Sequence, residues 1–362
     1  MIDLKNCTPE WIKEVSEENS FSNIVLIEKT IRAFMLLESL ILSGCPFVFK
    51  GGTALMLHLN SEKRLSIDID IICPPETDLE QYLSKYAHNY GFNNIKLIER
   101  KTSHHVPKSH AKYYYQAVYT TSAKTEYILL DVLFDNVLYN KVLQLPVQSR
   151  FLKTRGETVY VNLPSSADLL GDKLTAFAPN TTGIPYYKGD KLCSMEIVKQ
   201  LYDIASLFDI VDDLATVSDT FHKFAAVELA WRNLDAIDIK QVFDDIYKTS
   251  LCICLQGAVD NGNFRLLQDG IKRIQNFIHG ERYLLDTAIV NASKAAYLSV
   301  LIEKNITVLN RFDKNNIQSL QNDILEKPLN TKLNKLKKSN IEAFFYWNEI
   351  QKHGRNESSM EM

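Results

Sequence analysis

The sequence lacks the features typical of secreted, membrane-spanning and low-complexity proteins. Its 362 residues include only 13 glycines and 10 prolines, which excludes a collagen-like or broadly disordered chain. The 6 cysteines are scattered and show no Cys-x-x-Cys spacing of a zinc site. The most apolar window, FMLLESLILSG, is interrupted by Glu38, whereas a membrane-spanning helix needs about 20 apolar residues. The first residues show no apolar signal segment, so we expect a reduced, cytoplasmic protein without a membrane span.

The charges nearly balance, with 41 basic and 44 acidic residues and a net charge of −3. Such a chain has no overall positive field to attract nucleic acid, so any RNA or DNA contact depends on a local basic patch. The apolar share of 46% and the length predict an ordinary globular protein of about two domains.

The pattern of apolar residues changes near residue 163. The first part alternates helical and strand periodicity in the order β-α-β-α-β-β-β, which predicts a mixed sheet with helices on it. The second part is almost entirely helical in pattern. We therefore expect an α+β protein with a mixed-sheet domain at 1–163 and a helical domain at 164–362. Expected helices cover 22–43, 78–91, 166–178, 195–211, 217–232, 237–254, 263–279, 282–308, 314–326 and 340–352, and expected strands cover 46–50, 65–73, 94–100, 112–120 and 126–134.

Strict alternation over residues 66–71 predicts a strand that carries acids on one face. Ser66, Asp68 and Asp70 would share that face, while three isoleucines fix the other face in a core. The two carboxylates would stand about 6.5–7 Å apart at Cα and can converge on one cation. Carboxylates mounted in this way suit Mg²⁺ held together with substrate phosphates. The alternative is the solvated face of an edge strand, which alternation alone favours.

Two further features support a ligand site. Lys50-Gly51-Gly52-Thr53 lies between a short strand and an expected helix, where paired glycines and a helix N-terminus favour an anion. Asp131 shares a strand face with two leucines, where an acid is costly unless it is paired or metal-bound. Pairing with a basic side chain remains an alternative for Asp131, and Asp135 is the fallback carboxylate. Two metals held by three carboxylates are what nucleotidyl transfer needs.

The stretch FVFKGGTAL followed by RLSIDIDI resembles the signature of the AbiEii/AbiGii-type toxins, and the resemblance covers roughly residues 25–210. These are bacterial members of the DNA polymerase β-like nucleotidyltransferase superfamily, known from type IV toxin–antitoxin and abortive-infection systems. The resemblance implies a nucleotide pocket lined by Gly51, Gly52, Thr53, Arg64, Ser66, Asp68 and Asp70. Asp68 and Asp70, together with Asp131 from the reasoning on its strand face, are the expected ligands of Mg²⁺ or Mn²⁺. Gly-Thr stands where the superfamily has Gly-Ser and keeps the hydroxyl. Arg64 is either a phosphate ligand or a partner of a carboxylate.

The family's next two motifs are matched by SSADLLGDKLTAFAP and, imperfectly, by KQLYD. The resemblance implies that Lys173 clamps the triphosphate and that Asp203 is a catalytic acid. Taken alone, Lys173 within an apolar stripe would more simply be a lysine whose ammonium extends outward to solvent. Asp203 would more simply be an acid on a helix surface. Gln200 and Lys199 stand where the family motif has an acid and an arginine.

Two basic segments are candidate contacts for an acceptor. Residues 96–115 combine Lys96, Lys112 and other basic groups with His104, His105, His110 and Tyr113–Tyr115, and such mixtures track phosphates and stack bases. Residues 327–338 hold five lysines and no acid. The simpler alternative for each segment is a solvated charged face. The histidines lack a nearby carboxylate or cysteine in the sequence, which disfavours a metal site there.

The leading hypothesis is a nucleotidyltransferase toxin. By resemblance, it would transfer NMP from an NTP to an RNA acceptor, with the 3′ end of tRNA as the expected acceptor, under the control of a cognate antitoxin protein. One alternative is a metal-dependent phosphoesterase or nuclease that uses the same acids and needs no NTP. Another is a non-catalytic member that binds a nucleotide or a partner protein.

Overall fold

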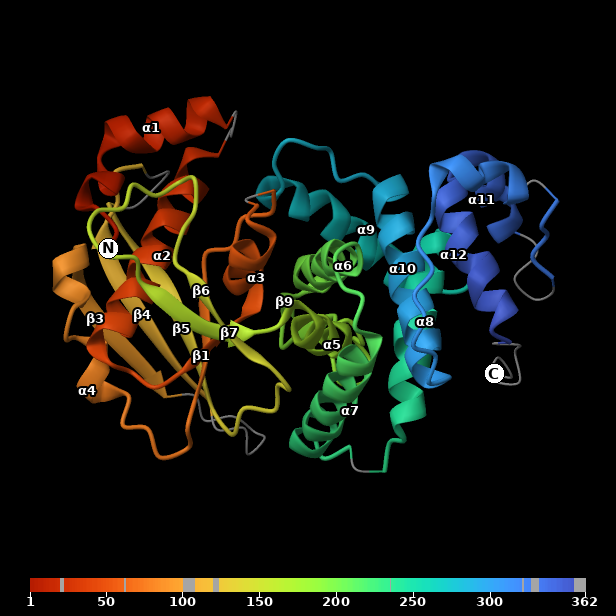
Figure 1. Cartoon of the computed structure of the whole chain (residues 1–362), viewed down its shortest axis with the longest axis horizontal. Coiled ribbons are helices and arrows are strands. Elements are labelled where there is room, and N and C mark those ends of the chain that lie inside the picture. Colours follow the sequence, from red (N-terminus) through yellow and green to blue (C-terminus); the bar gives the residue numbers. More distant parts are fainter. Residues whose placement is uncertain are drawn as a thin grey trace. The chain divides into compact units, whose positions relative to one another are not determined.

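The computed structural model describes residues 1–19, 23–61, 63–99, 108–119, 124–234, 236–320, 322–326 and 332–354. The chain divides into two compact units (Figure 1). Unit 1 contains Met1–Ser165 together with Asn276–Arg282, and unit 2 contains Ser166–Gln275 together with Tyr283–Met362. The segment Asn276–Arg282 thus belongs to unit 1 although the chain around it belongs to unit 2. One domain boundary after residue 163 is predicted from the sequence, and that prediction does not include this return of the chain to unit 1.

Unit 1 is built on a five-stranded mixed sheet in the order β1-β2-β5-β4-β3. Strands β2 and β5 run parallel, whereas the other neighbouring pairs are antiparallel. The strands are β1 (Val48–Lys50), β2 (Ile69–Cys73), β3 (Phe92–Glu99), β4 (Lys108–Gln116) and β5 (Thr125–Phe134). Strand β2 is shorter than predicted, because residues 65–68 are not part of a strand. Ser66 and Asp68 therefore precede the strand that carries Asp70.

Alternate residues of the sheet separate into two faces. One face is apolar and fully buried, with Phe49, Ile71, Val132, Leu130 and Tyr113 each at most 1% exposed. The long helix α2 (Ile24–Ser43) contributes Ile27, Ile31 and Phe34 to the same core. The other face, here called the polar face, carries the chemical groups described below.

Smaller elements complete unit 1. Helix α3 (Gly51–Leu59) begins directly at the end of β1, as the sequence predicted. The predicted helix at 78–91 is wrong, because the chain forms only two short turns there, α4 (Glu80–Leu83) and η2 (Ala87–Tyr90). The remaining elements are η1 (Leu4–Cys7), α1 (Pro9–Glu18) and the hairpin of β6 (Val142–Pro146) and β7 (Tyr160–Pro164).

Unit 2 is helical, as predicted. Its helices are α5 (Ser166–Ala176), α6 (Ser194–Phe208), α7 (Leu214–Trp231), α8 (Ile239–Cys254), α9 (Asn261–Ile274), α10 (Leu285–Glu303), α11 (Leu333–Ser339) and α12 (Ile341–Lys352). A small hairpin, β8 (Tyr187–Lys188) with β9 (Lys191–Leu192), lies between α5 and α6, and 3-10 turns form η3 (Gln275–Phe277) and η4 (Lys314–Leu320). The α-helix predicted at 314–326 is wrong, since η4 is a 3-10 turn and the described residues 322–326 are not helical. No helix of the described residues has the length and apolar character needed to cross a bilayer.

Candidate active site in unit 1

The turn from β1 into α3 is shaped by Gly51. Its φ of +81° lies in the left-handed region, which residues with a Cβ atom rarely adopt. A Cβ at this position would also collide with Asp70, reaching 2.8 Å from its Cγ atom. The backbone of the turn and the Asp70 carboxylate are therefore in direct contact. This contact brings the glycine motif and the acidic strand, predicted separately from the sequence, to one place.

Gly52 provides a second close approach. A Cβ on Gly52 would lie 2.6 Å from Arg64 Nη2 and 2.7 Å from Ser66 Oγ, so both side chains lie against this glycine. The next residue, Thr53, is fully buried, and its hydroxyl donates a 2.7 Å hydrogen bond to the carbonyl of Asp68. The Thr53 hydroxyl thus fastens α3 to the segment before β2. The structure places all the predicted residues from Gly51 to Asp70 around the start of α3.

The N-terminus of α3 has no side-chain cap. The first backbone N–H groups of a helix have no partner within the helix, and the helix dipole adds partial positive charge at this end. Such an end favours an anion, and phosphate groups are bound there in many proteins. Arg64 brings a full positive charge to the same turn.

Arg64 is held in place by the part of the chain that returns to unit 1. It is only 7% exposed, and it forms an isolated β-bridge with Ile278. The neighbouring backbone is fixed by hydrogen bonds from Leu65 N to the Phe277 carbonyl (2.8 Å) and from His279 N to the Lys63 carbonyl (2.7 Å). The segment 276–282 therefore orders the polypeptide that carries Arg64.

A row of four polar side chains crosses the polar face of the sheet. The strand register pairs Lys50 with Asp70, Asp70 with Asp131, and Asp131 with His110. Residues opposite each other on neighbouring strands share a face, and neighbouring strands lie about 4.8 Å apart. The structure thus brings Asp70 and Asp131 together as predicted. Asp68 lies two residues before Asp70, outside the strand.

His110 is a member of this row that sequence reasoning did not assign. Its Nδ1 atom contacts Asp131 Oδ1, and its Nε2 atom is buried without a hydrogen-bond partner among the described residues. The side chain of His110 is 12% exposed, against 35% for Asp131. His110 therefore contacts one carboxylate oxygen of Asp131 from the more buried side, and the Asp131 carboxylate remains partly accessible to solvent.

The acids as they stand do not form a complete metal site. Within the described ranges, no group of three or more His, Cys, Asp or Glu side chains is arranged to hold a metal ion. The backbone register of Asp70 and Asp131 suits a shared ion, but one oxygen of Asp131 faces His110. The assignment of Asp68, Asp70 and Asp131 as metal ligands stays a prediction.

Lys173 and Asp203 lie in unit 2, where they form a buried ion pair. Lys173 Nζ is 2.8 Å from Asp203 Oδ2 and donates a 3.0 Å hydrogen bond to Gln200 Oε1. The side chains of Lys173 and Asp203 are 9% and 0% exposed. The two simpler alternatives, an outward-pointing lysine and a surface acid, are therefore wrong. Helix α5 and helix α6 each contribute one partner, so the two family motifs meet within this unit.

The two basic segments separate into buried and accessible parts. Tyr113 and Tyr115 lie in the core at 0% and 1% exposure, whereas Lys112 and Tyr114 lie on the polar face. His104 and His105 lie outside the described residues. In the second segment, Lys332, Lys335 and Lys338 are exposed on or beside α11, and Lys337 donates to the Asp323 carbonyl (2.6 Å).

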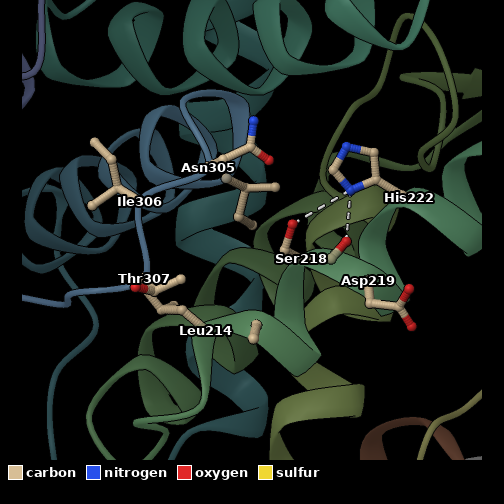
Figure 2. A pocket seen from close by; sticks show the side chains of 9 residues that line it. Leu214, Ser218, Asp219, His222, Asn305, Ile306 and Thr307 are labelled. Atoms are coloured by element: carbon tan, nitrogen blue, oxygen red, sulfur yellow. Dashed lines mark hydrogen bonds between the residues drawn. The ribbon is translucent and has the colours of Figure 1, made fainter.

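Unit 2 also contains a pocket of about 360 Å³ between the start of α7 and the end of α10. His222 lines this pocket, and its Nδ1 donates a 2.7 Å hydrogen bond to the Ser218 carbonyl one turn earlier (Figure 2). Leu214, Asn305 and Ile306 also line it. None of the predicted site residues does, so no part of the predicted chemistry is assigned to this pocket.

Comparison with known proteins agrees with the motifs of unit 1. Residues 35–282 match the family model described as "Nucleotidyl transferase AbiEii toxin, Type IV TA system". A solved structure described as a candidate nucleotidyltransferase from H. pylori is similar over 77% of this chain and 96% of its own, with 14% identity and a TM-score of 0.40. No curated protein sequence matches the chain.

Proposed function

The chain belongs to the AbiEii nucleotidyl transferase toxin family of type IV toxin–antitoxin systems, and we propose that it transfers the NMP of an NTP to the end of an RNA acceptor. The proposed acceptor, taken from the family resemblance, is the 3′ end of a tRNA. The observation that carries the proposal is the row of Lys50, Asp70, Asp131 and His110 beside the Gly51 turn. It places acids next to a turn suited to phosphate.

The glycine turn and its surroundings would bind the triphosphate. The uncapped N-terminus of α3 offers backbone N–H groups, and Gly51 and Gly52 let Asp70, Arg64 and Ser66 lie directly against this turn. Arg64 supplies a fixed positive charge, because its position is set by the bridge to Ile278. Ser66, which lies against the same side of Gly52 as Arg64, would donate its hydroxyl to a phosphate oxygen. These contacts would orient the α-phosphate towards the acids.

The acids would serve the transfer step. Asp68, Asp70 and Asp131 would hold Mg²⁺ or Mn²⁺, and the cation would neutralise phosphate charge. The acceptor hydroxyl attacks the α-phosphorus, a new P–O bond forms, and the bond to the bridging oxygen breaks to release pyrophosphate. The hydroxyl proton passes to a carboxylate, for which Asp131 is the candidate. His110 would keep Asp131 in place by donating Nδ1–H to one of its oxygens.

Lys173 is the proposed clamp for the triphosphate, and its ion pair sets a condition on that role. The ammonium is already neutralised by Asp203 and bonded to Gln200. To contact a phosphate, it must give up part of this pairing. In this proposal, Asp203 and Gln200 hold the Lys173 side chain in place when no nucleotide is bound. The family further implies a cognate antitoxin as protein partner, and growth arrest when the antitoxin is missing.

The test is a transfer assay with purified protein, total RNA, Mg²⁺ or Mn²⁺, and each NTP labelled in turn at the α-phosphate. We expect label in RNA and an equal amount of free pyrophosphate, and no label with Asp70→Asn. RNA cleavage without NTP would instead indicate a nuclease, and the absence of both products would indicate a non-catalytic member. In either case the proposed function would be wrong.

A further inference from the structure

The polar face continues from the Asp131–His110 pair into a group of two lysines and two tyrosines. This group, here called the tyrosine–lysine strip, consists of Lys96, Lys112, Tyr114 and Tyr127. The strand register pairs Lys96 with Lys112 across β3 and β4, and Tyr114 with Tyr127 across β4 and β5. Because side chains alternate along a strand, the strip lies on the same face as Asp131 and His110.

The strip is not part of the core of unit 1. Tyr127 is 38% exposed and Lys96 is exposed, whereas Tyr113 and Tyr115 point to the other face and pack edge-on against Phe92 in the core. The strand thus divides three successive tyrosines between two environments. Burial explains Tyr113 and Tyr115, but it does not explain an aromatic pair on the polar face.

The members of the strip contact one another. Lys112 Nζ lies 4.1 Å from the centre of the Tyr127 ring, and the rings of Tyr114 and Tyr127 are tilted with their centres 5.8 Å apart. Neither Lys96 nor Lys112 forms a salt bridge with a carboxylate of the described residues. The strip therefore offers positive charge together with accessible aromatic rings.

We propose that the tyrosine–lysine strip binds the single-stranded end of the RNA acceptor. The inference rests on the proposed function in one respect, namely that the acceptor is RNA. Lysines bind backbone phosphates, and tyrosine rings stack with bases of any sequence. A double helix keeps its bases stacked on each other, so only an unpaired end can use the rings.

The position of the strip fits an acceptor whose last nucleotide reaches the acids. Tyr127 precedes Asp131 by four residues on β5, which corresponds to about 13 Å along the strand. Lys112 lies between them, two residues along β4 from His110. The terminal hydroxyl would lie at Asp131 while the preceding nucleotides follow the strip. The strip would therefore select RNA acceptors that have an unpaired end, because only such an end can lie along it and reach Asp131.

The test measures RNA binding directly, by fluorescence anisotropy, with no NTP and no metal. The probes are a labelled single-stranded RNA oligonucleotide and a blunt hairpin of equal length. Tyr127→Leu removes the ring, Tyr127→Phe keeps it, and Tyr160→Leu changes an exposed tyrosine of β7 outside the strip. Circular dichroism checks that each variant is folded.

We expect the wild type to prefer the single strand. Tyr127→Leu should weaken its binding about 5- to 150-fold, the range seen when one stacking ring is lost. Tyr127→Phe and Tyr160→Leu should bind like the wild type. Lys112→Gln should lower the slope of log affinity against log salt by about 0.7, as expected for one phosphate contact on a single strand.

Equal binding by Tyr127→Leu and the wild type, or equal binding of hairpin and single strand, would overturn the inference. An unchanged salt slope in Lys112→Gln would do the same. These outcomes do not depend on transfer. A protein that binds RNA through the strip but releases no pyrophosphate would contradict the proposed function and leave the inference standing.

Discussion

Gly51 and Gly44 allow the phosphate turn to be tested with a matched control. Both have a φ of +81°, but a Cβ at Gly44 would meet nothing within 4 Å, whereas a Cβ at Gly51 would collide with Asp70. Gly51→Ala and Gly44→Ala therefore impose the same backbone strain. Only Gly51→Ala also disturbs the acids.

The expected magnitudes follow from this difference. A residue with a Cβ in the left-handed region costs about 1–2 kcal/mol. For domains of 150–250 residues each kcal/mol lowers Tm by about 2–4 °C, so the backbone strain alone should lower the Tm of each variant by roughly 2–8 °C. At Gly51 the added carbon would lie 2.8 Å from Asp70 Cγ, so the turn or the carboxylate must move. Moving a catalytic group by about 1 Å from its productive position lowers the reaction rate about 100-fold.

The assay compares the melting temperature with the initial rate of label transfer to RNA. We expect Gly51→Ala to lose at least as much stability as Gly44→Ala, and only Gly51→Ala to lose about 100-fold or more in transfer. Equal transfer by the two alanine variants would contradict a role of the Gly51 turn in the site. It would mean that the contact between the turn and Asp70 has no part in the site.

Three further predictions concern other parts of the chain. Lys173→Met leaves Asp203 buried without its ammonium partner, which should lower the free energy of unfolding in urea by about 3–5 kcal/mol. Adding Asp203→Leu should restore most of this loss. Full stability of the single variant would contradict the buried pair. His110→Leu should lower the rate of transfer about 10- to 100-fold at unchanged stability. His110→Asn keeps a hydrogen-bond donor for Asp131 and should retain most of the wild-type rate. Equal rates in the two variants would exclude the positioning role of His110. Burial holds the pKa of His58 below its ordinary value of 6.5, although its hydrogen bond to the Pro164 carbonyl opposes this shift. The unfolded chain then binds the proton first, so the free energy of unfolding should fall as the pH falls below about 6.5, and His58→Gln should weaken that dependence; identical pH profiles would show that His58 contributes nothing.

Much of the site could be predicted because its signals are local in sequence. The glycine pair follows a short strand, and alternation marks the acids, so Gly51, Gly52 and Asp70 were found from neighbouring residues alone. The third acid, Asp131, was singled out because a charged side chain interrupts an apolar strand face. The structure confirms that the backbone of Asp131 is the neighbour of Asp70.

The remaining features depend on contacts between distant residues. His110 faces Asp131 only because β4 and β5 pair in one particular register, which the sequence does not specify. Lys173 looks like a surface lysine in its own helix, because its partner Asp203 is on α6. Three successive tyrosines could not be divided between core and polar face without knowing which residues of β4 face α2. The return of residues 276–282 to unit 1 likewise leaves no periodic signal.

A crystal structure with Mn²⁺ and a non-hydrolysable NTP analogue, with the ion located by anomalous scattering, would locate the metal and the nucleotide directly. We predict an ion bound by oxygens of Asp70 and Asp131 at about 2.0–2.2 Å, with the triphosphate at the N-terminus of α3 beside Gly51 and Arg64. Binding of the ion and the nucleotide only elsewhere, for example in the pocket beside His222 in unit 2, would show that the proposed site in unit 1 is wrong.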